Sequence, residues 1–151
     1  MIGEFERYHG AVIRELIVGA NQALNIESYD DMGRVNTYRV NGTMGIHIKH
    51  SSKRLPPWQF TYLNDNVSEI ERLAARCKSV WLIHVCGQDG AVALSLEEFW
   101  SVNPRGAETT SFVRVDRDRN TMYRVNGTGG KLSRPKRRGL HYIFDELQGQ
   151  E

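Results

Sequence analysis

The sequence predicts one α/β domain with a mixed central β-sheet flanked by helices, followed by a β-rich basic C-terminal extension. Its 151 residues suit a single domain with its own hydrophobic core. Helical and strand periodicities alternate over residues 4–100, whereas strand patterns dominate residues 110–125. Residues 80–86 are almost continuously apolar, which is typical of a strand covered on both faces. We therefore assign residues 1–105 to the α/β core and residues 106–151 to the extension of the same domain.

The first part of the chain combines a helix with a β-hairpin. Apolar side chains recur near helical spacing over residues 4–24, which predicts the first helix. Asn41-Gly42 separates two alternating segments, and this dipeptide is a strong hairpin signal. We therefore expect residues 35–40 to pair with residues 43–50.

Strands and helices then alternate. A short strand is expected over residues 59–63, and Asn64 or Asp65 is expected to cap the following helix. The strand over residues 80–86 should pair with residues 91–94, after which Ser95-Leu-Glu-Glu98 forms a capping box that opens a short helix.

The extension begins with two predicted strands, over residues 112–115 and 122–125. The hexapeptide Tyr-Arg-Val-Asn-Gly-Thr occurs twice, at residues 38–43 and 123–128. The residues around the two copies differ, so we interpret both as strand-to-turn units with the same Asn-Gly chemistry rather than as a duplication.

The predicted hairpin has one polar and one apolar face. A two-residue turn would set Asn36 opposite His47 and Arg34 opposite Lys49. Val35, Ile46 and Ile48 would share the inward face. The polar group is either the solvated face of an amphipathic hairpin or a chemical site, and the sequence leaves both open.

Basic residues are segregated although the formal net charge is only +2. Residues 34–54 hold five bases and no acid, and residues 114–141 hold nine bases against two acids. Such segments are typical of phosphate contacts. The expected contacts are Lys53, Arg54, Arg134, Lys136, Arg137 and Arg138. Trp58, after two prolines, is either a stacking platform for a base or a core anchor under its loop.

We do not expect membrane insertion, because no apolar segment approaches the length that spans a bilayer. The first residues show neither a basic leader nor an apolar signal core, so we expect a cytoplasmic protein. The partners expected are nucleic acid, DNA first, and no membrane, with assembly as a homodimer left open.

Residues 4–100 resemble the core of the PD-(D/E)xK nuclease superfamily, whose fold is restriction-endonuclease-like. The likeness rests on a helix with Glu15, a hairpin strand that ends Ile46-His-Ile-Lys49, and the helix and strands that follow. Ile48 to Thr61 is also similar to an "IK-x-S-x-K-R, P-W, F-T" signature of uncharacterised bacterial proteins. The resemblance implies a metal-dependent phosphodiesterase or endonuclease with Mg²⁺ or Mn²⁺.

Carried over by position, Glu15 matches the helix acid and Lys49 the strand lysine of that superfamily. Asn36 and His47 stand where the superfamily has metal-binding acids. Lys49 would stabilise charge on the phosphate, and Glu15 and His47 would hold the metal or a water. The alternative is a non-catalytic member of the fold that binds DNA or RNA, or a protein-interaction module whose bases meet an acidic partner.

Overall fold

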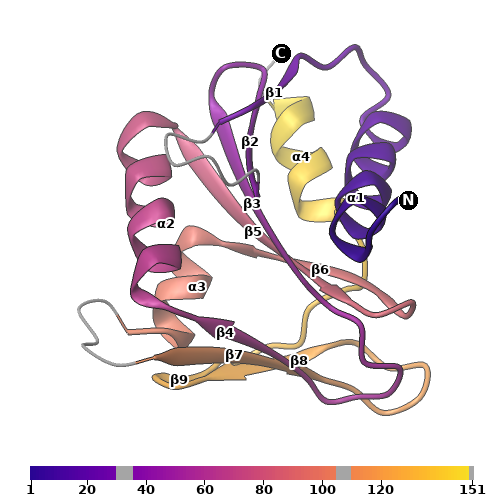
Figure 1. Cartoon of the computed structure of the whole chain (residues 1–151), viewed down its shortest axis with the longest axis vertical. Helices are drawn as coiled ribbons and strands as arrows, with labels where there is room; N and C mark the ends of the chain where they lie inside the picture. Colours follow the sequence, from indigo (N-terminus) through magenta and orange to yellow (C-terminus); the bar gives the residue numbers. More distant parts are fainter. Residues whose placement is uncertain (30–35, 105–109, 150–151) are drawn as a thin grey trace.

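A computed structural model describes residues 1–29, 36–104 and 110–149 (Figure 1). Four helices and two β-sheets make up this part of the chain. Its elements are α1 (Glu4–Gly19), β1 (Ile26–Ser28), β2 (Thr37–Val40), β3 (Met44–Ser51), β4 (Trp58–Tyr62), α2 (Asn64–Arg76), β5 (Ser79–Cys86), β6 (Gly90–Ser95), α3 (Leu96–Val102), β7 (Ser111–Asp116), β8 (Arg124–Gly127), β9 (Gly130–Lys131) and α4 (His141–Gly149). None of the helices in the described residues combines the length and apolar character that a membrane span requires.

The larger sheet, sheet A, confirms the predicted mixed α/β class. Its strand order is β1-β2-β3-β5-β6, in which β3 and β5 are parallel and the other pairs antiparallel. α1 and α4 cover one face of it (Figure 1). β5 is buried on both faces, as its apolar sequence predicted.

A second sheet, sheet B, corrects the expectation of a single central sheet. It is antiparallel with the order β4-β7-β8-β9, and it packs with α2 and α3 over the other face of sheet A (Figure 1). β4 alternates strictly, with Trp58, Phe60 and Tyr62 buried and Gln59 and Thr61 exposed. This alternation suits a sheet with one dry face and one wet face.

The C-terminal part is interwoven with the rest of the chain. The expected boundary at residues 105/106 lies outside the described residues, but β7 pairs with β4 from the predicted core. The chain then returns to sheet A, where Gly139 N donates to Ala91 O at 2.7 Å. The sequence did not predict α4, whose Ile143 and Leu147 enter the core beside α1.

The hairpin register differs from the prediction by one residue. Thr37, not Asn36, lies opposite His47, because residues 41–43 all belong to the turn. The carbonyl of Thr43 instead accepts a hydrogen bond of 2.8 Å from Lys78 N, just before β5. Thr43 therefore drops out of the pairing between β2 and β3. The expected contact of Arg34 with Lys49, and the place of Val35, lie outside the described residues.

Helix ends follow the capping rules in one case and depart from them in another. Ser95 Oγ accepts from Glu98 N at 3.2 Å and Glu98 Oε1 accepts from Ser95 N at 2.9 Å, so the predicted capping box of α3 is confirmed. α2 begins at Asn64 itself, with Leu63 at the N-cap position. Asn66 Oδ1 accepts from Leu63 N at 3.0 Å and replaces the predicted cap.

Candidate functional site

His47 and Lys49, both predicted to carry chemistry, lie on the same face of β3. Their neighbours Ile46 and Ile48 point the other way, into the core beneath α1 and α4. Side chains alternate along a strand, so the polar pair faces α2 and β4. This face is covered rather than solvated, and His47 has no exposed surface. The structure therefore rules out the interpretation of this strand as the wet side of an amphipathic hairpin.

A carboxylate that the sequence did not single out, Glu69 of α2, lies beside His47. Its Oε2 atom is 3.7 Å from His47 Nε2, which is longer than a hydrogen bond. Asn66 Nδ2 donates to the other carboxylate oxygen at 3.5 Å. Glu69 shares the buried stripe of α2 with Ile70 and Leu73. A carboxylate within an apolar helix stripe was therefore the signal that could have found it.

Close packing of α2 on β3 brings Glu69 to His47. Gly45 lies two residues before His47, and a Cβ built on it would come within 2.6 Å of Leu73 Cγ. Leu73 is one helical turn after Glu69. The absence of a side chain at Gly45 thus lets the helix approach the strand closely.

Lys49, Tyr62 and His84 extend the cluster toward β4. Lys49 Nζ donates to Thr61 O at 2.6 Å and lies 4.8 Å from the centroid of the Tyr62 ring. The Tyr62 hydroxyl oxygen and His84 Nε2 are in hydrogen-bond contact at 2.6 Å. Lys49 and His84 are direct neighbours on the parallel strands β3 and β5. We call His47, Lys49, Tyr62, Glu69 and His84 the polar centre.

Burial controls protonation in the polar centre. It lowers the pKa of His84 to about 3, and it also lowers the pKa values of His47 and Lys49. Both imidazoles are therefore neutral at pH 7. Burial alone would raise the pKa of Glu69, but its contacts with His47, Asn36 and Asn66 outweigh that effect and lower it. At neutral pH the pair is therefore an ionised carboxylate beside a neutral imidazole.

Acid is expected to destabilise the fold through His84. In the unfolded chain its pKa returns to about 6.5, so below that pH the unfolded state binds a proton that the folded state excludes. The free energy of unfolding should fall by about 1.4 kcal/mol per pH unit between about pH 6 and pH 4 from this residue. Urea titrations across this range measure the slope. His84→Gln keeps an acceptor for Tyr62 and should flatten it; an equal slope in both proteins would contradict the assignment.

Glu15, the helix acid of the predicted site, lies on the other side of sheet A. α1 packs against the apolar face of β3, away from Lys49. Burial raises the pKa of Glu15, partly opposed by His141 and Arg138. Asn36, by contrast, reaches the polar centre, where it helps to lower the pKa of Glu69. The structure thus brings together three of the four predicted catalytic residues and leaves Glu15 apart.

The polar centre matches a divalent-metal site only in part. Across residues 1–29, 36–104 and 110–149, no three His, Cys, Asp or Glu side chains gather closely enough to hold a metal ion. Glu69 is the single carboxylate of the polar centre, and its Oε2 atom has no hydrogen-bond partner among the described residues. Mg²⁺ prefers several oxygen ligands. The donor set therefore does not fit the one that the resemblance implies, and we derive no step through a metal.

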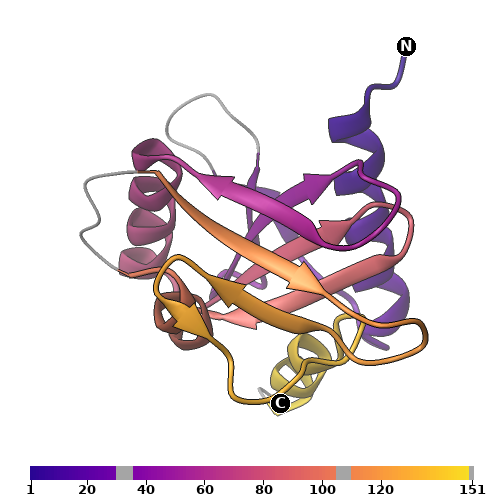
Figure 2. The ribbon, with the colours of Figure 1, turned by 90° about the horizontal axis from the view of Figure 1, so that it is seen from below.

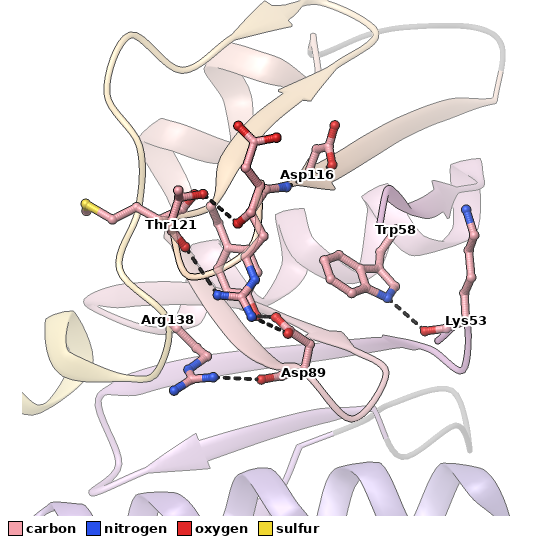
Figure 3. A network of polar contacts seen from close by, with 10 residues as sticks. Lys53, Trp58, Asp89, Asp116, Thr121 and Arg138 are labelled. Atoms are coloured by element: carbon pink, nitrogen blue, oxygen red, sulfur yellow. Dashed lines mark hydrogen bonds and ion pairs between the residues drawn. The ribbon is translucent and has the colours of Figure 1, made fainter. Parts of the chain in front are cut away.

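Two of the residues predicted to contact nucleic acid are buried. Trp58 is 1% exposed, and its Nε1 donates to Lys53 O at 2.8 Å (Figure 3). Of the two roles expected for Trp58, its burial therefore supports the core anchor beneath the loop of residues 52–57 and not the platform for a base. Lys136 is 6% exposed, with its Nζ 2.6 Å from Glu98 Oε1 and 3.8 Å from the centroid of the Tyr142 ring. Neither side chain is placed to contact a base or a phosphate.

The other predicted contacts are exposed on loops. Lys53 and Arg54 follow β3, whereas Arg134, Arg137 and Arg138 lie between β9 and α4. These five cations are exposed, and their contact with phosphate stays a prediction. Sequence reasoning did not identify the strand cations that share the surface of sheet B.

A polar network ties the loops at one end of the molecule together. Arg138 Nη1 donates to the carbonyl oxygen of Asp89 at 3.3 Å (Figure 3). The carboxylate of Asp89 accepts hydrogen bonds from Arg117 and Tyr123. Asp89 lies in the turn between β5 and β6, and Arg117 follows β7. This network therefore links the β5–β6 turn of sheet A to the segment that follows β7 in sheet B.

The outer face of sheet B is not covered by any other described segment (Figure 2). Val113 and Val115 of β7 point into the core, so Phe112, Arg114 and Asp116 point outward. We call the outward residues of the sheet the open face. Its members are Gln59, Thr61, Phe112, Arg114, Asp116, Arg124, Asn126 and Lys131.

Strand register arranges the open face in rows. Gln59, Arg114, Asn126 and Lys131 lie side by side across all four strands. Arg114 Nη2 donates to Gln59 Oε1 at 3.3 Å, which keeps the guanidinium along this row. In the next row Arg124 Nη2 is 3.7 Å from Asp116 Oδ2, so the positive charge of Arg124 is already paired. The available positive charge is therefore that of Arg114 and Lys131.

A groove of about 590 Å³ borders the open face. It lies between β8 and residues 131–135, with Lys131 and Arg134 on its wall. Met122, Leu132 and Pro135 add apolar surface to the same groove. Cations and apolar side chains in one groove can hold a ligand that has both an anionic and a flat apolar part.

Comparisons of the chain with protein-family models, with curated proteins and with solved structures gave no match. The class of protein is therefore defined by the fold alone: a mixed α/β protein with two sheets and four helices in its described residues.

Proposed function

We propose that this protein binds nucleic acid through the open face of sheet B and the adjoining groove. One observation carries the proposal: Arg114, Lys131 and Arg134 are exposed together on a face that no other described segment covers. Phosphate contacts supply most of the non-specific affinity for nucleic acid, and they come from such cations. The side chains of this face also remain accessible, because no described helix covers them.

The charge balance of the surrounding chain supports the same proposal. Residues 114–141 hold nine bases against two acids. Of the nine, Lys136 is buried in an ion pair, and Arg117 and Arg124 face acids. The remaining bases leave a net positive surface that attracts a polyanion. Lys53 and Arg54 add charge from the loop that precedes β4.

A salt titration tests this proposal. Fluorescence anisotropy of labelled single-stranded and double-stranded DNA and RNA would be followed as salt is raised, with and without EDTA. We expect the logarithm of the affinity to fall linearly with the logarithm of the salt concentration, and to be insensitive to EDTA. Absence of binding to every probe would overturn the proposal. It would favour instead an interaction module that docks an acidic protein.

The second candidate is phosphodiester hydrolysis, the activity of the PD-(D/E)xK superfamily, although the polar centre offers only Glu69 as a carboxylate for the Mg²⁺ or Mn²⁺ of that superfamily. One observation favours it: Glu69 brings a carboxylate to the cluster that contains His47 and Lys49. In this candidate Lys49 would stabilise negative charge on the phosphate. Glu15 has no part in it, because it lies across sheet A.

Lys49→Ala separates the second candidate from the first. Cleavage of labelled DNA and RNA on a denaturing gel with Mn²⁺ should disappear in Lys49→Ala and persist in Lys78→Ala if the polar centre is catalytic. Lys78 is the matched control because it is an exposed lysine just before β5 for which no nucleic-acid contact is predicted. Intact substrates with the wild-type protein would eliminate hydrolysis and leave binding untouched.

A further inference from the structure

We infer that the open face takes single-stranded rather than double-stranded nucleic acid, with Phe112 as a platform for one base. The inference rests on the proposed function and adds the class of ligand to it. Three features of the same surface lead to it: its width, its aromatic residue and its groove.

The width of sheet B disfavours insertion into a duplex. Its four strands, about 4.8 Å apart, place the outer strand axes about 14 Å from each other. The major groove of B-DNA is about 12 Å wide and admits a helix or a two-stranded ribbon. No helix in the described residues projects from this side of the sheet (Figure 2). Base edges therefore reach the open face only when they are unpaired.

Phe112 gives such a base a surface to stack on. It is half-buried and points outward between two buried residues, Ser111 and Val113. Among the described residues it belongs to neither hydrophobic core. Its row is one pleat repeat, about 7 Å, from the row of Arg114 and Asn126. An aromatic ring on a sheet beside cations and amides is the arrangement by which sheets bind unpaired bases.

The groove extends this surface on the side of β9. Asn126 and Lys131 belong both to the row across sheet B and to the lining of the groove. Arg134 supplies a second cation there, and Met122 and Leu132 supply apolar contacts. A single-stranded nucleic acid with one base stacked on Phe112 can thus continue along the row into the groove, where its phosphates meet Lys131 and Arg134. A duplex cannot make both contacts without unpairing.

Phe112→Ala tests this inference. Affinities for a single-stranded oligonucleotide and for the duplex of the same sequence would be measured at one salt concentration. We expect tighter binding of the single strand, and a loss of about tenfold for that ligand alone in Phe112→Ala. Phe112→Trp should restore stacking. Ile17→Ala is the matched control for removing an apolar surface side chain, because Ile17 is exposed on α1, away from sheet B.

The outcomes separate this inference from the proposed function. Equal affinity for both ligands with no effect of Phe112→Ala would overturn the single-strand inference and leave nucleic-acid binding in place. No binding of either ligand would overturn both. A loss in Phe112→Ala that Phe112→Trp does not restore would assign the residue a structural role and likewise contradict the inference.

Discussion

Replacing Arg114, Lys131 and Arg134 together with alanine is expected to weaken nucleic-acid binding about 100-fold near physiological salt. Each exposed charge contact is worth about 1 kcal/mol, or roughly fivefold, and three of them multiply. The salt dependence should become shallower by about 2, because each phosphate contact on a single strand contributes about 0.7 to the slope. Anisotropy titrations at several salt concentrations give both quantities.

A control variant with the same change in net charge separates the loss of local phosphate contacts from the effect of the protein's overall charge. Arg7, Arg14 and Lys78 are exposed on the sheet A side of the molecule, on α1 and before β5. Their triple alanine variant should lose only a few-fold in affinity, since screened charges far from the contact act weakly. Equal losses in the two triple variants would contradict the placement of the binding surface on sheet B.

Lys136→Ala is expected to lower the free energy of unfolding by about 3 kcal/mol while leaving nucleic-acid affinity unchanged. Lys136 Nζ lies 2.6 Å from Glu98 Oε1, with side-chain exposures of 7% and 30%. The same Glu98 oxygen accepts from Ser95 N in the capping box of α3. Removing the lysine leaves this carboxylate without its cation. The partial exposure of Glu98 places the loss at the lower end of the range for buried pairs.

The neighbouring Arg137 provides the comparison. It is exposed, so Arg137→Ala should change stability by no more than about 0.5 kcal/mol. Urea denaturation of both variants measures the difference. Unfolding of the two variants at the same urea concentration would contradict the stabilising role of Lys136. Loss of binding in Lys136→Ala alone would restore the sequence-based assignment of Lys136 to phosphate contact.

Features encoded by short-range periodicity could be predicted from the sequence. β5 and the capping box at Ser95 are set by contiguous residues, and both are confirmed. The hairpin register failed because Thr43 pairs with Lys78, which is distant in the sequence. Sheet B was missed for the same reason, since β4 pairs with a strand about fifty residues later.

The repeated hexapeptide shows how context overrides local chemistry. Asn41-Gly42 forms the turn between β2 and β3, with positive φ at both residues. Asn126-Gly127 instead lies within β8, so the expectation of a second Asn-Gly turn was wrong. A Cβ at Gly127 would come within 2.5 Å of Val102 O and 2.6 Å of Phe112 O. There glycine is needed for close packing rather than for a turn.

The site was predictable to the extent that strand alternation decides it. Alternation correctly placed His47 and Lys49 on one face of β3. It could not show which face α1 would cover, so Glu15 was grouped with residues across the sheet. Glu69 joins the polar centre only because α2 packs closely at Gly45. The open face required the pairing of β4 with β7, which no local pattern encodes.

Photo-cross-linking tests the binding surface most directly. An oligonucleotide carrying 5-iodouracil, which reacts with aromatic side chains in contact, would be irradiated with the protein and the cross-linked peptides identified by mass spectrometry. We expect cross-links at Phe112 and in the peptides that contain β7, β8 and residues 131–135. Cross-links confined to α1 or to the strands of sheet A would contradict binding at the open face.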